Sequence, residues 1–227
     1  MLQQHTGNLV RLGILTLPLS ALLTFVGLIG RYGVPNPRYD PKGAVEAVGS
    51  TEYFVSQLVG NVLGLTVLIF GVLALTAYLA NTRARGLALA GMVLSIVGIG
   101  VALSGLGLNT YALPEISRAY VSGQQDVLVI VTAIYGGLVR QLFVPVALLY
   151  SAGFILFGVA IWRSGVLPKP AAISLAVHAP LLQGFFRAQL NWAAVVGALL
   201  FILGSVVIAF SVFRRTSAEQ AEAEADS

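Results

Sequence analysis

The clearest feature of the hydropathy pattern is a pair of apolar stretches within residues 58–108, joined by the basic turn Asn81-Thr82-Arg83-Ala84-Arg85-Gly86. A helix of about 20 apolar residues crosses the hydrocarbon core of a bilayer, and each stretch is long enough to do so. Because the turn is short, the second helix must return beside the first. The pattern therefore predicts a membrane-spanning helical hairpin.

Three further apolar runs are long enough to cross a bilayer, and a fourth is shorter. The long runs cover residues 8–30, 141–162 and 192–213. The short run, residues 171–186, is interrupted by His178 and Pro180. Whether this run crosses decides between five and six membrane spans.

Residues 127–139 form an apolar segment that is too short to span a bilayer. Arg140 separates it from the run that follows. We expect the segment to lie in the membrane interface or to dip into the membrane. The alternative is one long tilted helix over residues 127–162, with Arg140 pointing into the bundle.

Two polar stretches, residues 31–57 and 109–126, separate some of these helices. Both contain helix-start chemistry, which is an N-cap side chain or a proline at the first helical position. These signals predict a short helix over 42–48 after Asp40-Pro41, the start of a helix over 51–80 at Ser50, and a short helix at Pro114.

The positive charges orient the chain, because Lys and Arg in short connections favour the cytoplasmic side. With six spans, the basic residues of the tight connections share one side: Arg11, Arg83, Arg85, Arg163, Lys169, Arg214 and Arg215. With five spans, Arg214 and Arg215 would lie outside, against the rule. We therefore expect six spans in a bacterial cytoplasmic (inner) membrane, with both termini cytoplasmic and the long loops outside.

The composition supports an all-α, polytopic transmembrane bundle with short interfacial helices in its outer loops. Of the residues, 57% are hydrophobic and only 10% are charged, against about 25% charged in soluble domains. The net charge of +4 is therefore attributed to membrane topology, not to nucleic acid. We expect one membrane domain over residues 1–213 and a charged, disordered cytoplasmic tail over 214–227.

Glycines recur at a spacing of seven on both arms of the hairpin: Gly64 and Gly71, then Gly91, Gly98 and Gly105. This spacing returns to nearly the same helix face, and small residues let membrane helices approach closely. We expect these faces to form the seam of the hairpin. Besides the lipid bilayer, other membrane subunits are possible partners of such Gly-rich faces.

His178 is the one histidine within an apolar stretch. Ionisable groups in membrane segments are costly and often functional, so a haem or chlorophyll-type pigment at His178 is one hypothesis. A packed, hydrogen-bonded histidine beside Pro180 is the simpler interpretation. We therefore predict no cofactor, and no residue pattern indicates a metal site.

A second group of candidates lies near the predicted outer membrane edge. Arginine can bind phosphate or carboxylate through two parallel hydrogen bonds, and glutamines lie close to two of the arginines. The candidate ligand-binding residues are Arg140, Arg187, Gln141, Gln183, His178, Glu115 and Arg118.

No catalytic motif is present, so we expect a protein that is not an enzyme. The first hypothesis is an accessory subunit or a small-ligand-binding or sensing bundle that recognises its target through the outer loops. A small transporter with a cavity between its helices is the alternative. A haem-, pigment- or quinone-associated subunit that uses His178 is the second alternative.

Two basic turns carry a resemblance to a known group. They are Arg83-Ala84-Arg85-Gly86 and Ser164-Gly165-Val166-Leu167-Pro168-Lys169. With the order of the apolar runs, they resemble a widespread group of small bacterial six-helix membrane proteins of unknown function. The resemblance implies a six-helix fold and no catalytic residues.

Overall fold

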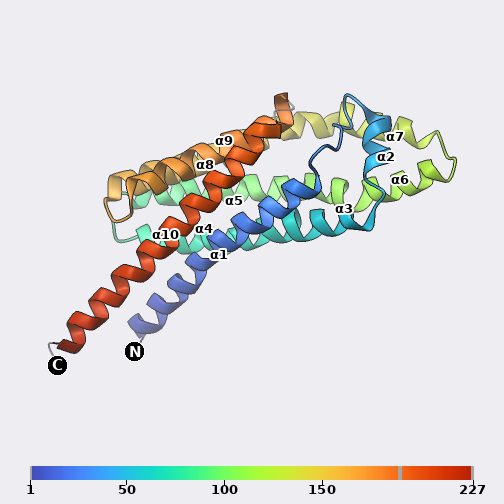
Figure 1. Cartoon of the computed structure of the whole chain (residues 1–227). Coiled ribbons are helices and arrows are strands. Elements are labelled where there is room, and N and C mark those ends of the chain that lie inside the picture. The colour runs from blue at the N-terminus through green and yellow to red at the C-terminus, as the bar shows by residue number, and fades with distance from the viewer. Residues whose placement is uncertain (1, 189–190, 226–227) are drawn as a thin grey trace.

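The structure, a computed structural model, is built from helices that lie side by side along one long axis (Figure 1). It describes residues 2–188 and 191–225. Within these ranges it describes the side chains of all residues except 2–7, 138–140, 142–143, 146, 184–188 and 216–225. All regular elements of the described part are helical.

Six long helices make up the bundle: α1 (Leu2–Gly30), α4 (Gly64–Leu79), α5 (Arg85–Gly107), α8 (Leu138–Ser164), α9 (Lys169–Ala188) and α10 (Asn191–Ala225). Each packs against the next, and α10 packs back against α1, so the six close a ring. The order around the ring is α1, α4, α5, α8, α9 and α10.

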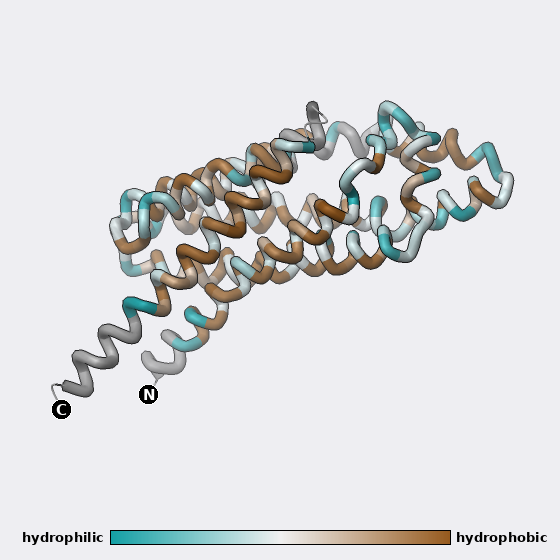
Figure 2. Tube along the Cα trace, in the orientation of Figure 1, coloured by the Kyte–Doolittle hydropathy of each residue, from teal (hydrophilic) through white to brown (hydrophobic). Residues whose placement is uncertain are grey.

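Five segments of the described chain are long and apolar enough to cross a membrane: Asn8–Gly30, Thr51–Leu79, Arg85–Val121, Ala147–Ser164 and Asn191–Arg215. Figure 2 shows hydrophobic residues along the length of the bundle and hydrophilic residues at its two ends. The predicted all-α membrane bundle is confirmed at this level. The division into a domain over 1–213 and a disordered tail stays a prediction.

The first polar stretch begins two helices where the sequence predicts them. Asp40 caps α2 (Pro41–Ala47), and its Oδ1 accepts a hydrogen bond of 2.8 Å from the Gly43 amide. Ser50 caps α3 (Thr51–Ser56) by accepting from the Tyr53 amide at 3.1 Å. A π-helical segment, η1 (Gln57–Leu63), then joins α3 to α4 without a break.

Most of the second polar stretch is helical, and only residues 122–126 form a turn. After α5 the helix continues through the π-helical segment η2 (Leu108–Ala112) into α6 (Leu113–Val121). Asn109 and Thr110 are buried here, so these polar residues are enclosed by neighbours. The short helix predicted at Pro114 is present, but it continues from α5 where a loop from residue 109 was expected, because polarity alone does not distinguish a solvated turn from a buried polar layer.

The apolar segment after this stretch is a separate helix, α7 (Val127–Gly136), as the partition of residues 127–162 predicts. The break falls at Gly137, with φ −91° and ψ −138°, and not at Arg140, which lies inside α8. The one long tilted helix is therefore not formed.

The short helices α2, α3, α6 and α7 gather at one end of the bundle, and we call them the cap (Figure 1). The cap has its own hydrophobic core, separate from that of the bundle. Its buried members are Val45, Val48, Tyr53, Leu113, Tyr120 and Val131. Ser117 of α6 ties the cap together by donating to the carbonyl oxygen of Val45 at 2.6 Å.

The glycine faces of the hairpin do not meet each other. Gly64 and Gly71 of α4 lie against α1, where a Cβ on Gly64 would lie 3.2 Å from Leu23. Gly91 and Gly98 of α5 lie against α8. The predicted hairpin seam was therefore wrong, because glycines at every seventh residue identify a close-packing face but not the helix that packs on it.

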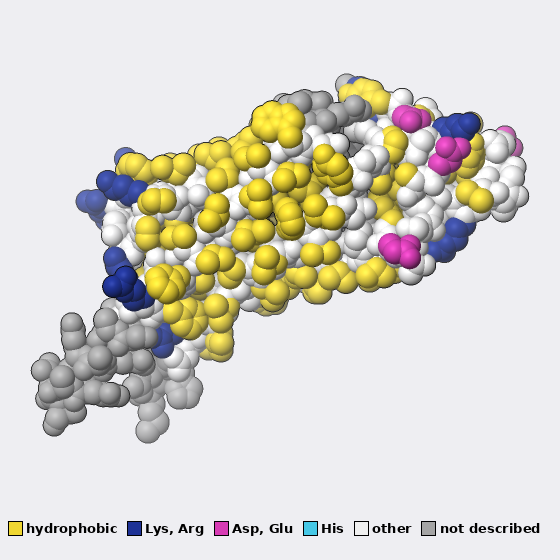
Figure 3. All heavy atoms as spheres, in the orientation of Figure 1, with side chains coloured by type: hydrophobic (Ala, Val, Ile, Leu, Met, Phe, Trp, Pro, Cys, Tyr) yellow, Lys and Arg dark blue, Asp and Glu magenta, His cyan; other side chains and the backbone are white. Residues whose placement is uncertain are grey.

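Charge divides the two ends of the molecule. The turns between α4 and α5 and between α8 and α9 lie at the end opposite the cap, near both chain termini (Figure 1), and we call it the basic end. Figure 3 shows Lys and Arg at both ends but Asp and Glu only at the cap on the face in view.

A substitution at the α5–α8 contact tests the glycine packing. In Gly98→Ala the added Cβ would lie 2.7 Å from the backbone nitrogen of Tyr150, and such overpacking costs about 1–3 kcal/mol. We expect a lower thermal unfolding midpoint in detergent. The matched control is Gly100→Ala on the same helix, where no atom lies within 4 Å of the new Cβ. Equal midpoints for the two variants would contradict the packing.

Candidate ligand-binding site at the cap

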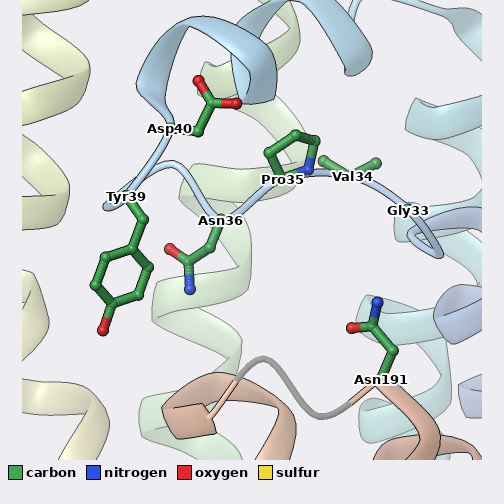
Figure 4. Close-up of a pocket in the computed structure, with 7 residues that line it drawn as sticks. All are labelled: Gly33, Val34, Pro35, Asn36, Tyr39, Asp40 and Asn191. Atoms are coloured by element: carbon green, nitrogen blue, oxygen red, sulfur yellow. The ribbon is translucent and has the colours of Figure 1, made fainter.

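A pocket of about 390 Å³ lies between the loop that follows α1 and the first residue of α10 (Figure 4). It is within the range of small-molecule sites, roughly 300–1,000 Å³. Its lining combines two amides, a carboxylate, a phenol ring and an apolar wall. The lining residues are Gly33, Val34, Pro35, Asn36, Tyr39, Asp40 and Asn191.

The loop is held in shape by its own hydrogen bonds. The side-chain oxygen of Asn36 accepts from the backbone amide of Arg38 at 3.0 Å, an Asx turn that this residue type favours. The Asn36 carbonyl accepts from the amides of Tyr39 and Asp40 at 2.9 and 3.0 Å. Because the Asn36 oxygen is engaged, its NH₂ group is the part that remains to bind a ligand.

The side chains around the pocket come from opposite directions. Figure 4 shows the amide of Asn36 and the ring of Tyr39 directed away from α2, and the amide of Asn191 directed toward the loop. Asp40 turns back toward α2, where one oxygen caps that helix. The site therefore offers hydrogen-bond donors and acceptors from two separate segments, with no Lys or Arg among its lining residues.

A second pocket of about 370 Å³ adjoins the same loop and shares Gly33 and Val34 with the first. Tyr32, Ser50, Glu52 and Tyr53 contribute its polar groups. Gly33 has φ +84°, in the region that favours glycine. This residue thus makes the bend between the two pockets.

Beneath the loop, Arg31 lies close to the phenol groups of Tyr53 and Tyr135. Burial lowers the pKa of Arg31, and the two neighbouring phenols act in the opposite direction. Burial also raises the pKa of Tyr135, so this phenol is neutral at pH 7 while the guanidinium remains charged. The Tyr135 hydroxyl donates to the side-chain oxygen of buried Asn109 at 2.5 Å, which joins α7 to η2.

The two π-helical segments place further amides in the same layer, where they contact each other. Gln57 is buried and donates to the Gly27 carbonyl of α1 at 3.2 Å. Asn61 donates to the Gln57 side chain at 2.7 Å. π-helical turns occur often at functional sites, and here they form a polar layer between the cap and the apolar bundle.

His178 lies elsewhere, inside the contact between α8, α9 and α10. It is fully buried, and its Nδ1 lies 2.6 Å from the Leu175 carbonyl oxygen. Its ring stacks on Phe201 at 4.4 Å and meets the ring of Phe154 edge-on at 4.7 Å. Nε2 is enclosed without a hydrogen-bond partner, so a haem or chlorophyll could reach it only if these rings moved apart.

The remaining predicted residues are not brought together in the described part of the chain. Glu115 and Arg118 pair with each other on the exposed face of α6. Gln141 is exposed on α8, and Gln183 is half-buried on α9. The side chains of Arg140 and Arg187 lie outside the described residues. Among those described, no three His, Asp or Glu residues lie together as metal ligands.

The sequence pattern indicates the outer loops but not the residues that line the pocket. Asn36 stands between two prolines, a pattern that indicates only a turn, and Asp40 was predicted as a helix cap and not as a lining residue. Asn191 carries no local signal, because its relevance depends on a loop about 150 positions away along the chain.

Comparisons with known proteins give no family. No family model matches the chain, and neither the curated proteins nor the solved structures provide a match. The resemblance to small six-helix membrane proteins therefore stays a prediction.

Substitutions at His178 separate a packing role from a ligand role. His178→Phe keeps an aromatic ring and removes both the unpartnered Nε2 and the Nδ1 contact with the Leu175 carbonyl, so we expect an unfolding midpoint close to that of the parent. His178→Ala leaves a cavity and should lower the free energy of unfolding by about 2–5 kcal/mol. Both are measured by thermal unfolding in detergent. A visible absorbance band in the parent protein that His178→Phe abolishes would contradict the packing role.

Proposed function

We propose that this chain is a non-catalytic, multi-pass membrane protein that binds a small polar ligand at the cap. The observation that carries the proposal is the pocket between the loop of residues 33–40 and Asn191. It is formed by two segments far apart in sequence, so occupancy of the pocket would connect α1 with α10. In a binding or sensing protein, a bound ligand could act on the protein through this connection between α1 and α10.

The lining determines the class of ligand. Asparagine amides and a phenol hydroxyl bind hydroxyl or amide groups, and the Tyr39 ring offers an apolar face. Arg38 is not among the lining residues, and its guanidinium already lies over that ring at 4.8 Å from its centroid. Because Asp40, the carboxylate of the lining, turns back to cap α2, we assign the pocket to an uncharged ligand that carries several hydroxyl or amide groups.

Two observations favour this function over the alternatives. A transporter needs a polar path between its helices, whereas the largest fully buried side chains of the bundle are apolar: Phe154, Phe157, Phe201, Ile14 and Leu17 among them. The haem or pigment alternative requires access to Nε2 of His178, which the surrounding rings enclose. An accessory subunit remains compatible with binding at the cap, although α1 and α8 already cover several Gly-rich faces.

We also propose that α9 crosses the membrane, which gives six spans with both termini cytoplasmic in a bacterial inner membrane. Three observations support this topology. α9 packs along both α8 and α10, the two termini lie at the same end of the bundle, and the basic turns lie at that end too (Figure 1). The cap and its pocket then face the outer side.

Single cysteines test this topology, because the chain has none of its own. We expect Gln124→Cys and Asn191→Cys to react with a membrane-impermeant maleimide from outside intact cells, and Asn81→Cys to react only after lysis. A five-span protein would instead place Asn191 on the side of Asn81. Labelling of position 191 only after lysis would therefore contradict the crossing of α9.

Defined probes test the ligand proposal. Purified protein is titrated with glucose, N-acetylglucosamine and myo-inositol, with choline as a cationic comparison, in lauryldimethylamine oxide because sugar-headed detergents would compete. We expect at least one uncharged probe to raise the unfolding midpoint and choline to have no effect. Asn191→Leu should lower the affinity for that probe about tenfold, which corresponds to the loss of one or two hydrogen bonds.

The matched control is Asn81→Leu, at an exposed asparagine of the α4–α5 turn. It should bind the probe as the parent does. Equal binding by Asn191→Leu and the parent, or a response to choline alone, would contradict the proposed site. The unfolding midpoint of each variant without probe shows whether the fold is intact.

A further inference from the structure

Two turns at the basic end are tied to each other across a long stretch of chain. Arg83, in the α4–α5 turn, donates from Nε to the carbonyl oxygen of Arg163 at the end of α8, at 2.6 Å. A charged donor makes such a bond stronger than a neutral one. The bond holds the α4–α5 turn against the α8–α9 turn, so the basic residues of both turns share one surface.

Four cations occupy this surface: Arg83, Arg85, Arg163 and Lys169. All four are exposed, and none forms an ion pair with another described residue. The basic residues of the cap differ, because Lys42 pairs with Glu46 and Arg118 pairs with Glu115.

The distribution of carboxylates explains the difference. The carboxylates whose side chains the structure describes belong to the cap and its loops: Asp40, Glu46, Glu52, Glu115 and Asp126. The other four, Glu219, Glu222, Glu224 and Asp226, lie outside the described side chains. Among the described side chains, the basic end therefore presents cations without carboxylates, a surface that fits an anionic group.

Trp162 indicates the depth of these cations in the membrane. It lies in the last turn of α8, 48% exposed, and the Lys169 ammonium lies 5.0 Å from its ring centroid. Tryptophan with one exposed face is enriched at the level of the lipid headgroups. The cations next to it lie at the same level, where a lipid phosphate is found.

An apolar surface continues from Trp162 along α8. Ile155 and Val159 are 42% and 39% exposed, and with Trp162 they follow the spacing of seven and three or four residues that defines one helix face. Acyl chains can lie along this face while the headgroup reaches the two turns. The two turns and the apolar face of α8 can therefore contact the headgroup and the acyl chains of one phospholipid.

We infer that the paired turns bind the phosphate of an anionic phospholipid. Arg83 uses Nε to hold the Arg163 carbonyl, which leaves both terminal NH₂ groups of its guanidinium for the phosphate oxygens. Arginine binds phosphate in this forked geometry, and basic pockets between membrane helices bind anionic headgroups. The site is independent of the ligand proposed for the cap.

The competing explanation is diffuse attraction, in which each cation near an anionic leaflet contributes equally. The chain supplies a matched control for it, because Arg215 is exposed on α10 at the same end but outside the paired turns. If the site is specific, Arg83 and Arg163 contribute more to the lipid affinity than Arg215 does. If the attraction is diffuse, all three arginines contribute equally.

Native mass spectrometry of the full chain in detergent, titrated with phosphatidylglycerol or with phosphatidylcholine of the same acyl chains, tests the inference. We expect phosphatidylglycerol to bind to the parent protein. Arg83→Gln and Arg163→Gln should each lower the affinity for this lipid about five- to tenfold. Arg215→Gln should change that affinity by less than about twofold. Arg83→Lys keeps the charge but loses the fork, so its affinity should fall between those of the parent and Arg83→Gln.

Three results would overturn the inference. They are equal losses in the Arg83, Arg163 and Arg215 variants, equal binding of the two lipids, and displacement of phosphatidylglycerol by an equimolar amount of inorganic phosphate. The last result would assign the site to free phosphate in place of a lipid. Thermal midpoints without added lipid show that each variant is folded, and a variant that does not fold is replaced by Lys169→Gln, which leaves the Arg83–Arg163 bond intact.

Discussion

Close contact between helix backbones is the constraint on which the rest of this structure depends. Lipid tails are as apolar as leucine side chains, so burial alone does not hold membrane helices together. Van der Waals attraction between closely packed helix surfaces holds the helices together, and glycine permits the closest approach. Gly60 of η1 lies against Gly27 of α1, Gly98 against Tyr150 of α8, and Gly197 of α10 against Leu182 of α9. These three contacts pair α1 with η1 (which continues into α4), α5 with α8, and α9 with α10.

This pairing also explains why the two ends of the molecule differ. The tight turns at the basic end leave little room for polar structure, so the bond from Arg83 to Arg163 is the principal polar tie described there. At the other end, α3 and α6 prolong two bundle helices and support α2 and α7. The cap therefore forms a second small core around Tyr53, Leu113 and Val131, and its loops enclose the pockets.

The polar layer between the cap and the bundle connects these two regions. Gln57, Asn61 and Asn109 lie on π-helical segments, which shift the helix register by a fraction of a turn and bring amides inward. Their hydrogen bonds to α1 and α7 satisfy groups that would otherwise be costly to bury. Arg31, at the start of the pocket loop, lies in the same region beside Tyr53 and Tyr135. The shape of the pocket loop thus depends on groups that are buried beneath it.

The sequence by itself determined those properties that depend on neighbouring residues. Hydropathy predicted the long helices because span length is a local quantity, and the caps at Asp40 and Ser50 were predicted because a cap bonds only to its own first turn. The short helix after residue 127 was predicted for the same reason. The crossing of α9 stays a prediction, since His178 and Pro180 interrupt its hydropathy while its packing resembles that of its neighbours.

Only the tertiary structure decided which surfaces meet. The glycine spacing marked the correct faces of α4 and α5 but not their partners, α1 and α8, because the periodicity of one helix contains no information about another. In the same way, Asn36 and Asn191 become one site only when α1 and α10 lie side by side. Residues distant in sequence are brought together by the packing of the whole ring, and no local pattern encodes that arrangement.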